Sequence, residues 1–298
     1  MRRLFLVAVL FWFLPLAWAA PVLRVATYNV ENYLDSATST RRAKSQESEA
    51  RVRDSILALH PDVIALQEMG SSNALLELGK KLKASGLDLP YWDQVSAYDT
   101  NIHLSLLSRY PIVARREHTN ETFVLDGRRI EVKRGFEDLD IQVNPRFVLT
   151  IIAAHLKSRI PTPTADEEEW RYQEAQILRR VIDSRFAEAP DCNLVVLGDF
   201  NDVQDSKPLK TIMGHGKTRL FDTRPAERNG AAPADARQIT WTHYYAKEDL
   251  FSRIDYILTS HTMESRWVKW ESYILSRPDW GVASDHRPLV AAFTIPDQ

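Results

Sequence analysis

The sequence predicts a mixed α/β protein whose core is two β-sheets packed face to face, with helices on the outside. Two observations support this prediction. Short aliphatic strand patterns outnumber helical patterns, and the two kinds are interleaved along the whole chain. The chain is also long enough to bury a large core, with 298 residues of which 44% are hydrophobic and 26% charged. We therefore expect one domain over residues 20–298.

Aliphatic runs that stop at polar residues mark the expected strands. The clearest is FVLTIIAA at residues 147–154, an uninterrupted apolar run typical of a strand buried on both faces. The expected strands are residues 23–30, 62–66, 94–97, 103–108, 112–116, 147–154, 192–197, 237–245, 253–258 and 289–294, with a hairpin region at 128–132 and 140–143.

Helices are expected where apolar residues recur at helical spacing. The first ends before Pro61, the second before Gly86, and the longest places Leu178 and Ile182 on one face. The expected helices are residues 39–60, 73–84, 165–188 and 209–213, and residues 229–236 and 281–288 are expected loops.

The first residues have the features of a secretory signal peptide. Arg2 and Arg3 precede an apolar run of 15 residues, 4–18, and Ala17-Trp18-Ala19 fits the small-x-small cleavage rule. The alternative is a retained membrane anchor, but the run is shorter than the roughly 20 residues that span a bilayer. We expect cleavage after residue 19, export to the periplasm or the medium, no stable membrane insertion afterwards, and a monomer.

Charge and cysteine content limit the possible functions. Without Arg2 and Arg3 the chain has 36 basic and 40 acidic residues, so no global positive field gathers nucleic acid, although a local basic groove is enough for a nuclease. Cys192 is the only cysteine, which excludes an intramolecular disulfide. We expect it to be a small buried residue at the start of a strand rather than a nucleophile.

Polar residues that bind metals or phosphate occur where several expected strands end. A single Glu or His at such a place is most often solvated or structural, but the same feature in six segments predicts a site at one rim of the scaffold. In GDFND, Asp199 and Asn201 project to one side of an extended chain, whereas Phe200 packs and Asp202 supports the loop. The residues concerned are Asn29, Glu68, His155, Asp199, Asn201, Asp255, Asp285 and His286.

In order, the segments TYNVEN, ALQE, AAHLKS, GDFND, RIDYIL and SDHRPL resemble those of the endonuclease/exonuclease/phosphatase superfamily, in particular its secreted bacterial members. This group includes pancreatic-type deoxyribonuclease, apurinic endonucleases, bacterial sphingomyelinases and inositol-polyphosphate phosphatases. The resemblance covers residues 23–295 and is specific for the superfamily but not for a substrate. It implies a four-layer sandwich of two packed mixed β-sheets flanked by helices, with the site at its rim.

The resemblance also implies roles for the residues. Glu68, Asn29 and Asp285 are the expected metal ligands, and Mg²⁺ is the expected ion, with Mn²⁺ or Ca²⁺ as alternatives. His286 is the expected general base, and Asp255 holds its tautomer. Asp199 orients or helps deprotonate the attacking water. Asn201 and His155 are expected to donate hydrogen bonds to phosphate oxygens.

Three further residues have weaker motifs. Asp99 in SAYDTNIHL is either a site acid or a turn residue, and Lys157 in HLKSR either contacts a substrate phosphate or is solvated. Arg146, before the expected strand 147–154, is a possible second phosphate contact, although a surface position is favoured. The basic run Arg128, Arg129, Lys133 and Arg134 either lines the site or forms a solvated hairpin.

The function best supported by the sequence is an exported, metal-dependent nuclease or phosphodiesterase acting on nucleic acid or another phosphoester. The alternative is a phosphatase or a sphingomyelinase-like phospholipase of the same fold. A non-catalytic binding protein is disfavoured because such a protein need not retain the whole set of polar residues. The lipid alternative is weakened because no exposed apolar hairpin is evident, and we expect Tyr91-Trp92 and WVKW at 267–270 to pack in the core.

Overall fold

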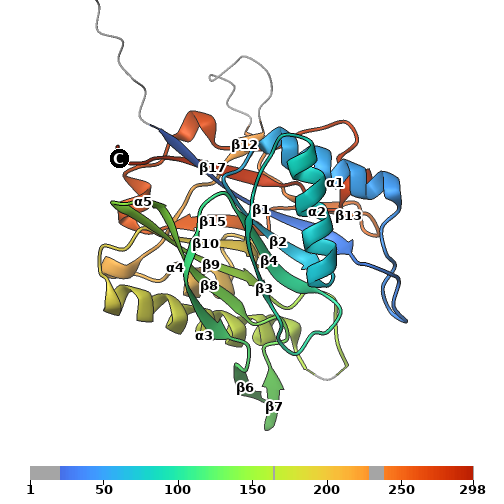
Figure 1. The fold of residues 1–298 in the computed structure, drawn as a ribbon. Coiled ribbons are helices and arrows are strands. Elements are labelled where there is room, and N and C mark those ends of the chain that lie inside the picture. The colour runs from blue at the N-terminus through green and yellow to red at the C-terminus, as the bar shows by residue number, and fades with distance from the viewer. Residues whose placement is uncertain (1–20, 164, 228–237, 298) are drawn as a thin grey trace, which may run out of the picture.

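The computed structural model describes residues 21–163, 165–227 and 238–297, in which two large mixed β-sheets pack against each other (Figure 1). The seven-stranded sheet has the order β12 (Ala226–Glu227), β16 (Tyr273–Ile274), β17 (Leu289–Thr294), β1 (Val22–Tyr33), β2 (Val63–Met69), β4 (His103–Ser108) and β3 (Tyr91–Val95). The six-stranded sheet has the order β11 (Phe221–Asp222), β15 (Asp255–Thr259), β10 (Leu194–Asp199), β9 (Phe147–His155), β8 (Phe136–Asn144) and β5 (Ile112–His118). This confirms the predicted fold class.

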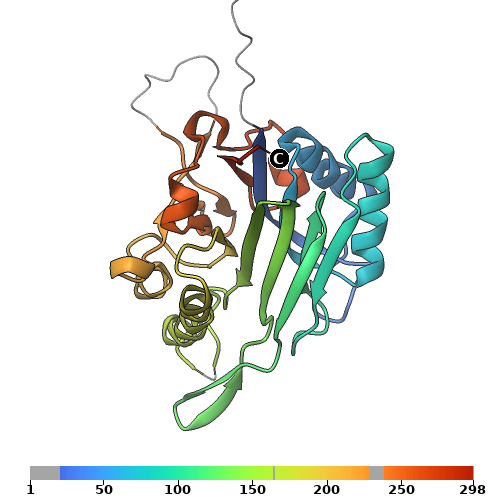
Figure 2. The ribbon, with the colours of Figure 1, turned by 60° about the vertical axis from the view of Figure 1, so that its left-hand side comes forward.

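Helices cover the outer face of each sheet, so the protein has four layers (Figure 2). Helix α1 (Gln46–Leu59) and helix α2 (Ser72–Ala84) bury apolar residues such as Ile56 and Leu78 against the seven-stranded sheet. Helix α3 (Glu167–Glu188) and helix α4 (Lys207–Met213) cover the six-stranded sheet. None of the helices in the described part of the chain is long and apolar enough to cross a membrane.

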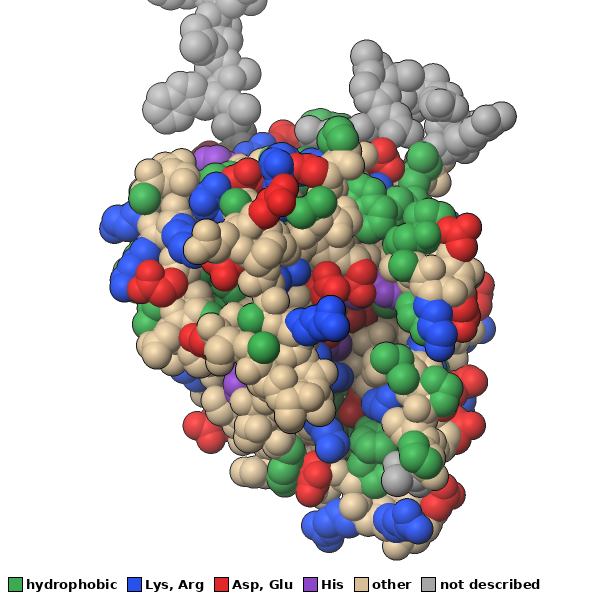
Figure 3. Space-filling view, turned by 90° about the vertical axis from the view of Figure 1, so that its right-hand side faces the viewer, with side chains coloured by type: hydrophobic (Ala, Val, Ile, Leu, Met, Phe, Trp, Pro, Cys, Tyr) green, Lys and Arg blue, Asp and Glu red, His purple; other side chains and the backbone are tan. Residues whose placement is uncertain are grey.

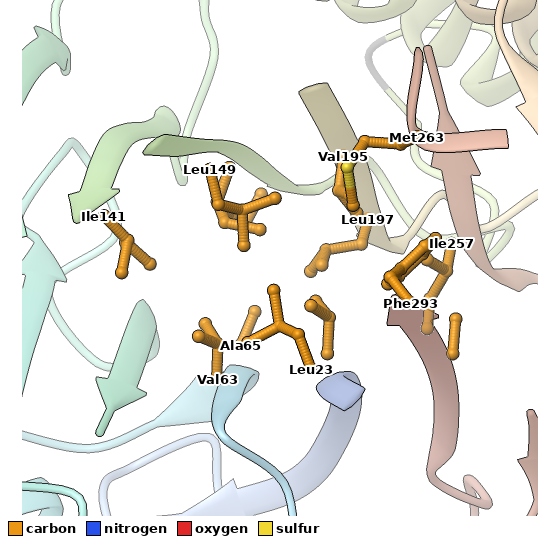
Figure 4. Close-up of a cluster of buried hydrophobic side chains, with 14 of the residues drawn as sticks. Leu23, Val63, Ala65, Ile141, Leu149, Val195, Leu197, Ile257, Met263 and Phe293 are labelled. Carbon is orange, nitrogen blue, oxygen red and sulfur yellow. The ribbon is translucent and has the colours of Figure 1, made fainter. Parts of the chain in front are cut away.

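The central core lies between the two sheets (Figure 4). Leu23 and Val63 of the first sheet face Leu149 and Leu197 of the second, and all four are fully buried. Burying these aliphatic side chains from both sheets is the main favourable contribution to folding. It also fixes how the rims of the two sheets meet.

Strand directions bring the chemically important ends to one rim. Strands β1 and β2 are parallel, as are β9 and β10. Strand β15 runs antiparallel to β10, so its first residue, Asp255, lies opposite Asp199 at the end of β10. Strand β17 runs antiparallel to β1, so the loop before Leu289 returns to the same rim.

The remaining elements are short. They are the hairpins β6 (Thr122–Leu125) with β7 (Arg128–Glu131) and β13 (His243–Tyr245) with β14 (Leu250–Ser252), helices α5 (His261–Glu264) and α6 (Trp280–Ala283), and the 3₁₀ turns η1 (Gly216–Thr218) and η2 (Lys269–Glu271). The β6–β7 hairpin extends from one end of the sandwich (Figure 2).

Several sequence predictions need correction. Helix α1 begins only at Gln46, because Ser45 caps it by accepting a hydrogen bond from the backbone of Ser48. Residues 128–132 and 140–143 do not pair with each other, since β7 pairs with β6 and β8 pairs with β5 and β9. The strand expected at 237–245 is only β13, and the expected loop 281–288 begins inside helix α6.

The aromatic and cysteine predictions also need qualification. Trp270 is 79% exposed and Tyr91 is 41% exposed, so these two do not pack in the core as expected, whereas Trp267 does pack against it. Cys192 is only partly buried and precedes β10, and burial raises the pKa of its thiol to about 11. The expected signal peptide, residues 1–19, and the expected loop 229–236 lie outside the described residues.

Candidate active site

Six of the eight polar residues expected at strand ends are brought together by contacts at one rim. Asn29 comes from β1, His155 from β9, Asp199 from β10 and Asp255 from β15. The turn after β10 adds Asn201 and the loop before β17 adds His286, both of which are buried. Both sheets therefore contribute to a single buried polar cluster.

His286 and Asp255 form a tight pair. His286 Nδ1 lies 2.9 Å from Asp255 Oδ2, and both side chains are almost completely buried. Burial alone lowers the pKa of His286, but the carboxylates of Asp255 and Asp199 outweigh it and raise that pKa well above its ordinary value. The two carboxylates therefore stabilise the imidazolium that forms when His286 takes up a proton, and its Nε2 lies 3.7 Å from Asp199 Oδ2.

Asp199 is the centre of the hydrogen-bond network. Its Oδ2 accepts from the carboxamide of Asn29 at 3.0 Å and from that of Asn201 at 3.2 Å, and its Oδ1 accepts from the backbone of Asn201 at 2.9 Å. His155 Nε2 lies 3.4 Å from the same Oδ2. Burial raises the pKa of Asp199 to about 7 despite the opposing field of His286. This carboxyl group can therefore exchange a proton near neutral pH.

His155 has the opposite electrostatic character. Burial lowers the pKa of His155 well below its ordinary value, and the positive charges of Arg134, His286 and Arg41 act in the same direction. The imidazole is therefore neutral and can donate one hydrogen bond to an anion.

The backbone of the rim adopts several uncommon conformations. Asn201 has φ 54°, Glu68 has φ 63°, and the consecutive residues Glu31 and Asn32 have φ 46° and 53°. Gly198, at φ 133°, lets β10 approach β9 closely, because a Cβ there would lie 2.0 Å from the carbonyl oxygen of Ala154. Such conformations cluster at functional sites, where the surrounding structure holds them in place.

The expected metal ligands are less tightly gathered. Glu68 Oε2 accepts from the backbone of Asn32 at 3.0 Å, and Asn29 Oδ1 accepts from the backbone of Glu31. Within the described residues, the groups of His and acidic side chains close enough to share an ion are His243, Asp285 and His286, and Asp199, Asp255 and His286. Glu68 belongs to neither group, and Asn29 offers a carboxamide, so the joint coordination of an ion by Glu68, Asn29 and Asp285 stays a prediction.

The chemistry of the rim nevertheless fits a hard divalent cation. Burial raises the pKa of Glu31, and the nearby carboxylates of Asp285 and Glu68 raise it further. Three carboxylates therefore act on one another in a site that also offers the second lone pair of the Asn29 carboxamide oxygen. An oxygen-rich, negatively charged donor set of this kind is the one that Mg²⁺, Mn²⁺ and Ca²⁺ prefer.

The structure adds site residues that the sequence analysis missed. The His243 ring lies 4.6 Å from that of His286, and its Nε2 lies 3.7 Å from Asp285 Oδ2. Glu31 accepts from the backbone of Asp285, and Lys44 and Arg41 approach the carboxylates from the segment before α1. Glu31 stands inside the TYNVEN motif, which is a signal that could have identified it. His243 has no such motif around it.

The three weaker sequence candidates have different positions. Asp99 Oδ2 lies 4.0 Å from Arg134, whose guanidinium donates to the carbonyl oxygen of Leu156 next to His155. Lys157 donates to the carbonyl oxygens of Ser158 and Ile160, so its ammonium is held by its own loop. Whether these two contact a substrate remains a prediction.

Arg146 has the surface position that was favoured for it, at the opposite end of β9 from His155. Arg146 is exposed in the turn before β9, whereas His155 is the last residue of that strand. At roughly 3.3 Å per residue, the strand separates the two by about 30 Å. A phosphate at His155 is therefore beyond the reach of Arg146.

The polar rim opens onto the surface (Figure 3). Acidic, basic and histidine side chains gather in a hollow on this face, and hydrophobic side chains border it. Beside His243, an aromatic group is formed by Trp241, Tyr244, Phe251 and Trp280, with ring centroids 4.5–5.9 Å apart. Phe251 is 51% exposed. The site is thus a charged hollow with an aromatic wall.

Comparison with known proteins agrees with this geometry. A model of the endonuclease/exonuclease/phosphatase family matches residues 26–286, which is most of the chain and includes every element of the rim. The chain belongs to this family. A search of curated proteins found no match.

Solved structures in this family's fold are similar along almost their whole length. Truncated TDP2 of Caenorhabditis elegans is 15% identical with a TM-score of 0.62, covering 92% of this chain and 98% of that one. The human Nocturnin catalytic domain with bound sulfate anion is 17% identical with a TM-score of 0.64, covering 92% and 95%. Sphingomyelinase C of Streptomyces griseocarneus is 18% identical with a TM-score of 0.58, covering 92% and 100%. At these identities the likeness shows the fold alone.

Proposed function

We propose that this protein is a metal-dependent phosphoesterase, and most specifically a nuclease or other phosphodiesterase that hydrolyses P–O bonds with water. The observation that carries the proposal is the buried His286–Asp255 pair directed at Asp199. It joins a proton acceptor, an orienting carboxylate and a second acid in one network, which is what activation of water requires.

The proposed reaction begins with a water that contacts both His286 Nε2 and Asp199 Oδ2, which lie 3.7 Å apart. His286 takes the proton of this water, and Asp255 stabilises the imidazolium that forms. The hydroxide attacks phosphorus opposite the leaving oxygen, the P–O bond to that oxygen breaks, and the leaving oxygen takes a proton from solvent. The imidazolium of His286 then returns its proton to solvent. Asn201 and neutral His155 donate hydrogen bonds to the non-bridging oxygens as charge develops on them.

The residues that would hold a metal are Glu68, Asn29 and Asp285, with Glu31 beside them. A bound divalent cation would act there as a Lewis acid on a phosphoryl oxygen. Asn29 also donates to Asp199, so one side chain links the proposed ligand set to the water-activating network. The expected ion is Mg²⁺, with Mn²⁺ or Ca²⁺ as alternatives.

The aromatic wall supports a nucleic-acid substrate. Nucleobases next to a reacting phosphate can stack on exposed aromatic rings, and such stacking is tolerant of sequence. Tyr244 of the wall follows His243 in β13, and the ring of His243 lies 4.6 Å from that of His286. A phosphodiester bound at His286 would therefore bring its flanking bases near these rings.

A sphingomyelinase-like phospholipase is the second candidate, and one observation favours it. Leu250 and Phe251 of β14 and Val282 of helix α6 are 46%, 51% and 45% exposed, so apolar side chains that the sequence did not predict lie exposed on elements near the site. Such side chains can enter a lipid interface. The turn between β13 and β14 contains Lys247, Glu248 and Asp249, however, so the most projecting part of this hairpin is polar. We therefore favour the nuclease.

A substrate panel tests the proposal. The purified protein is assayed with plasmid DNA, RNA, bis(p-nitrophenyl) phosphate, sphingomyelin vesicles, inositol phosphates and a phosphomonoester, with Mg²⁺ or Mn²⁺ and with excess EDTA. We expect hydrolysis of the diesters that requires the metal and is lost in His286→Ala. Activity confined to sphingomyelin supports the second candidate, and activity that survives EDTA contradicts both.

We also propose export, on the basis of the signal-peptide features of residues 1–19. Fractionation of cells producing the full chain is expected to recover the protein in the periplasm or medium, with an N-terminus at residue 20. An uncleaved protein in the membrane fraction contradicts this proposal.

A further inference from the structure

A short segment before helix α1 carries two basic residues to the acidic rim. Thr38 fixes its shape, because its hydroxyl oxygen accepts from the backbone of Arg41 at 3.1 Å and its backbone N–H donates to the Arg41 carbonyl at 2.9 Å. This small loop directs Arg41 toward Glu68, and Lys44 follows three residues later. The neighbouring Arg42 is exposed.

Lys44 is a fixed part of the rim. Its side chain is only 6% exposed, its ammonium donates to the carbonyl oxygen of Ala283 at 2.6 Å, and it lies 3.6 Å from Glu31 Oε2. These contacts join the edge of β1 to the loop that carries Asp285. A buried ammonium with such partners has little freedom to move away.

Arg41 is held differently. Its Nη1 donates to Asn32 Oδ1 at 2.6 Å but lies 3.5 Å from Glu68 Oε2, which also accepts from the backbone of Asn32. The Arg41 side chain is 26% exposed, so it sits on the open side of the carboxylate. A long, partly exposed ion pair of this kind contributes little energy and is easily exchanged.

We propose that Arg41 is a displaceable counterion of Glu68, which releases this carboxylate when a divalent cation binds and then contacts the substrate phosphate. The inference rests on the proposed function, because it assumes that Glu68 holds a metal. No rearrangement of the core is needed, since Arg41 belongs to a surface loop and, within the described residues, its guanidinium bonds only to Glu68 and to the Asn32 carboxamide oxygen.

The position of Arg41 also suits the second half of the proposal. Its positive charge acts on His155, where it helps to lower the pKa after the larger effects of burial, Arg134 and His286. Arg41 thus borders the same hollow as the proposed phosphate donors. A guanidinium offers several planar donors that match two phosphate oxygens at once, and Lys lacks this geometry.

The test measures metal binding without substrate, by titrating Mn²⁺ and following the free ion by electron paramagnetic resonance. Arg41→Ala is compared with the wild type and with Arg42→Ala, which removes the same charge from the adjacent exposed position. We expect Arg41→Ala to bind Mn²⁺ about two- to fivefold more tightly, the range of a partly exposed ion pair, and Arg42→Ala to match the wild type. Equal affinity of the two variants, or weaker binding by Arg41→Ala, overturns the counterion role.

Steady-state kinetics at saturating Mn²⁺ test the phosphate contact. We expect Arg41→Ala to raise KM about tenfold or more, as for loss of a charge-assisted hydrogen bond, with a smaller change in kcat. Arg41→Lys keeps the charge and serves as a second variant in case Arg41→Ala misfolds. We expect it to bind Mn²⁺ as the wild type does and still to raise KM. An unchanged KM in both variants overturns this half.

A further variant separates this inference from the proposed function. If Glu68→Gln binds Mn²⁺ as tightly as the wild type, Glu68 holds no metal, and both the ligand assignment and the role of Arg41 are overturned. If Glu68→Gln loses binding while Arg41→Ala behaves like Arg42→Ala, the proposed function stands and only the role of Arg41 is wrong.

Discussion

His286 Nδ1 and Asp255 Oδ2 lie 2.9 Å apart, and this contact joins the first residue of β15 to the loop that leads into β17. These two strands belong to different sheets. The second oxygen of Asp255, Oδ1, is buried without a hydrogen-bond partner in the described part of the chain. The carboxylate of Asp255 therefore has His286 as its hydrogen-bond partner, and this contact links the two sheets.

Loss of this contact is expected to reduce activity far more than stability. Asp255→Asn keeps the shape of the carboxylate but removes its charge, and His286→Ala removes the proton acceptor. We expect each to lower kcat by about 10² to 10⁴. His261→Ala serves as the control, because that histidine side chain is 81% exposed. Unchanged kcat in His286→Ala contradicts the proposed role.

Gly198 is expected to tolerate no side chain. In Gly198→Ala the new Cβ would meet the Ala154 carbonyl at 2.0 Å, so β9 and β10 must separate at the rim. We expect the free energy of unfolding to fall by about 3 kcal/mol or more, measured by urea denaturation. In Gly281→Ala the Cβ meets nothing within 4 Å, and that variant is expected to lose no stability. Similar stabilities of the two variants would mean that Gly198 does not lie this close to the Ala154 carbonyl oxygen.

Removal of the divalent ion is expected to abolish activity, and its addition to stabilise the fold. A ligand that binds only the folded state raises Tm, so Mg²⁺ or Mn²⁺ is expected to raise the Tm of the wild type after dialysis against EDTA. Glu68→Gln is expected to show a smaller rise and a large loss of kcat. A rise of the same size in Glu68→Gln would place the ion elsewhere.

Glu137 gives a prediction about pH and stability. It is buried in β8, both of its oxygens lack hydrogen-bond partners within the described ranges, and burial raises its pKa well above the ordinary 4.5. The folded state therefore holds this proton more tightly than the unfolded chain, so the group costs stability as the pH rises above about 4.5. Glu137→Gln is expected to be more stable than the wild type by about 1–3 kcal/mol at neutral pH.

The control for this prediction is Glu131→Gln, since Glu131 is exposed on the β6–β7 hairpin. The advantage of Glu137→Gln is expected to shrink as the pH falls toward 4.5 and to be lost below it, where the carboxyl is protonated in both states. A difference that does not depend on pH would show that packing rather than ionisation is responsible.

The sequence predicted the sheets and the polar residues of the rim because both depend on local patterns. Residues 103–108 and 289–294 were predicted with the boundaries of β4 and β17, since each is an apolar run between polar turns. The motif GDFND placed Asp199 and Asn201 on one side of the chain, and both contact each other through Asp199 Oδ2. Phe200 packs in the core as expected, stacked 5.6 Å from Tyr256.

The parts that the sequence did not predict depend on contacts between distant segments. His243 reaches His286 only because the β13–β14 hairpin folds over the rim. Arg41 and Lys44 were expected in the helix over residues 39–60. Because Ser45 caps helix α1, both lie in the segment before it, where Arg41 reaches Glu68. Pairing of β6 with β7 was missed because a short two-residue turn at Asp126-Gly127 was not recognised.

The pairing of β1 with β17 makes folding depend on the far end of the chain. Val22 lies opposite Thr294, so the first described strand has no partner on that side until the last strand is present. Pairs this distant in sequence form slowly, and an unpaired strand edge is prone to aggregate. A chain cut before Leu289 therefore lacks the strand that pairs with one edge of β1. That edge stays unpaired, so the whole chain must be synthesised before the product is soluble.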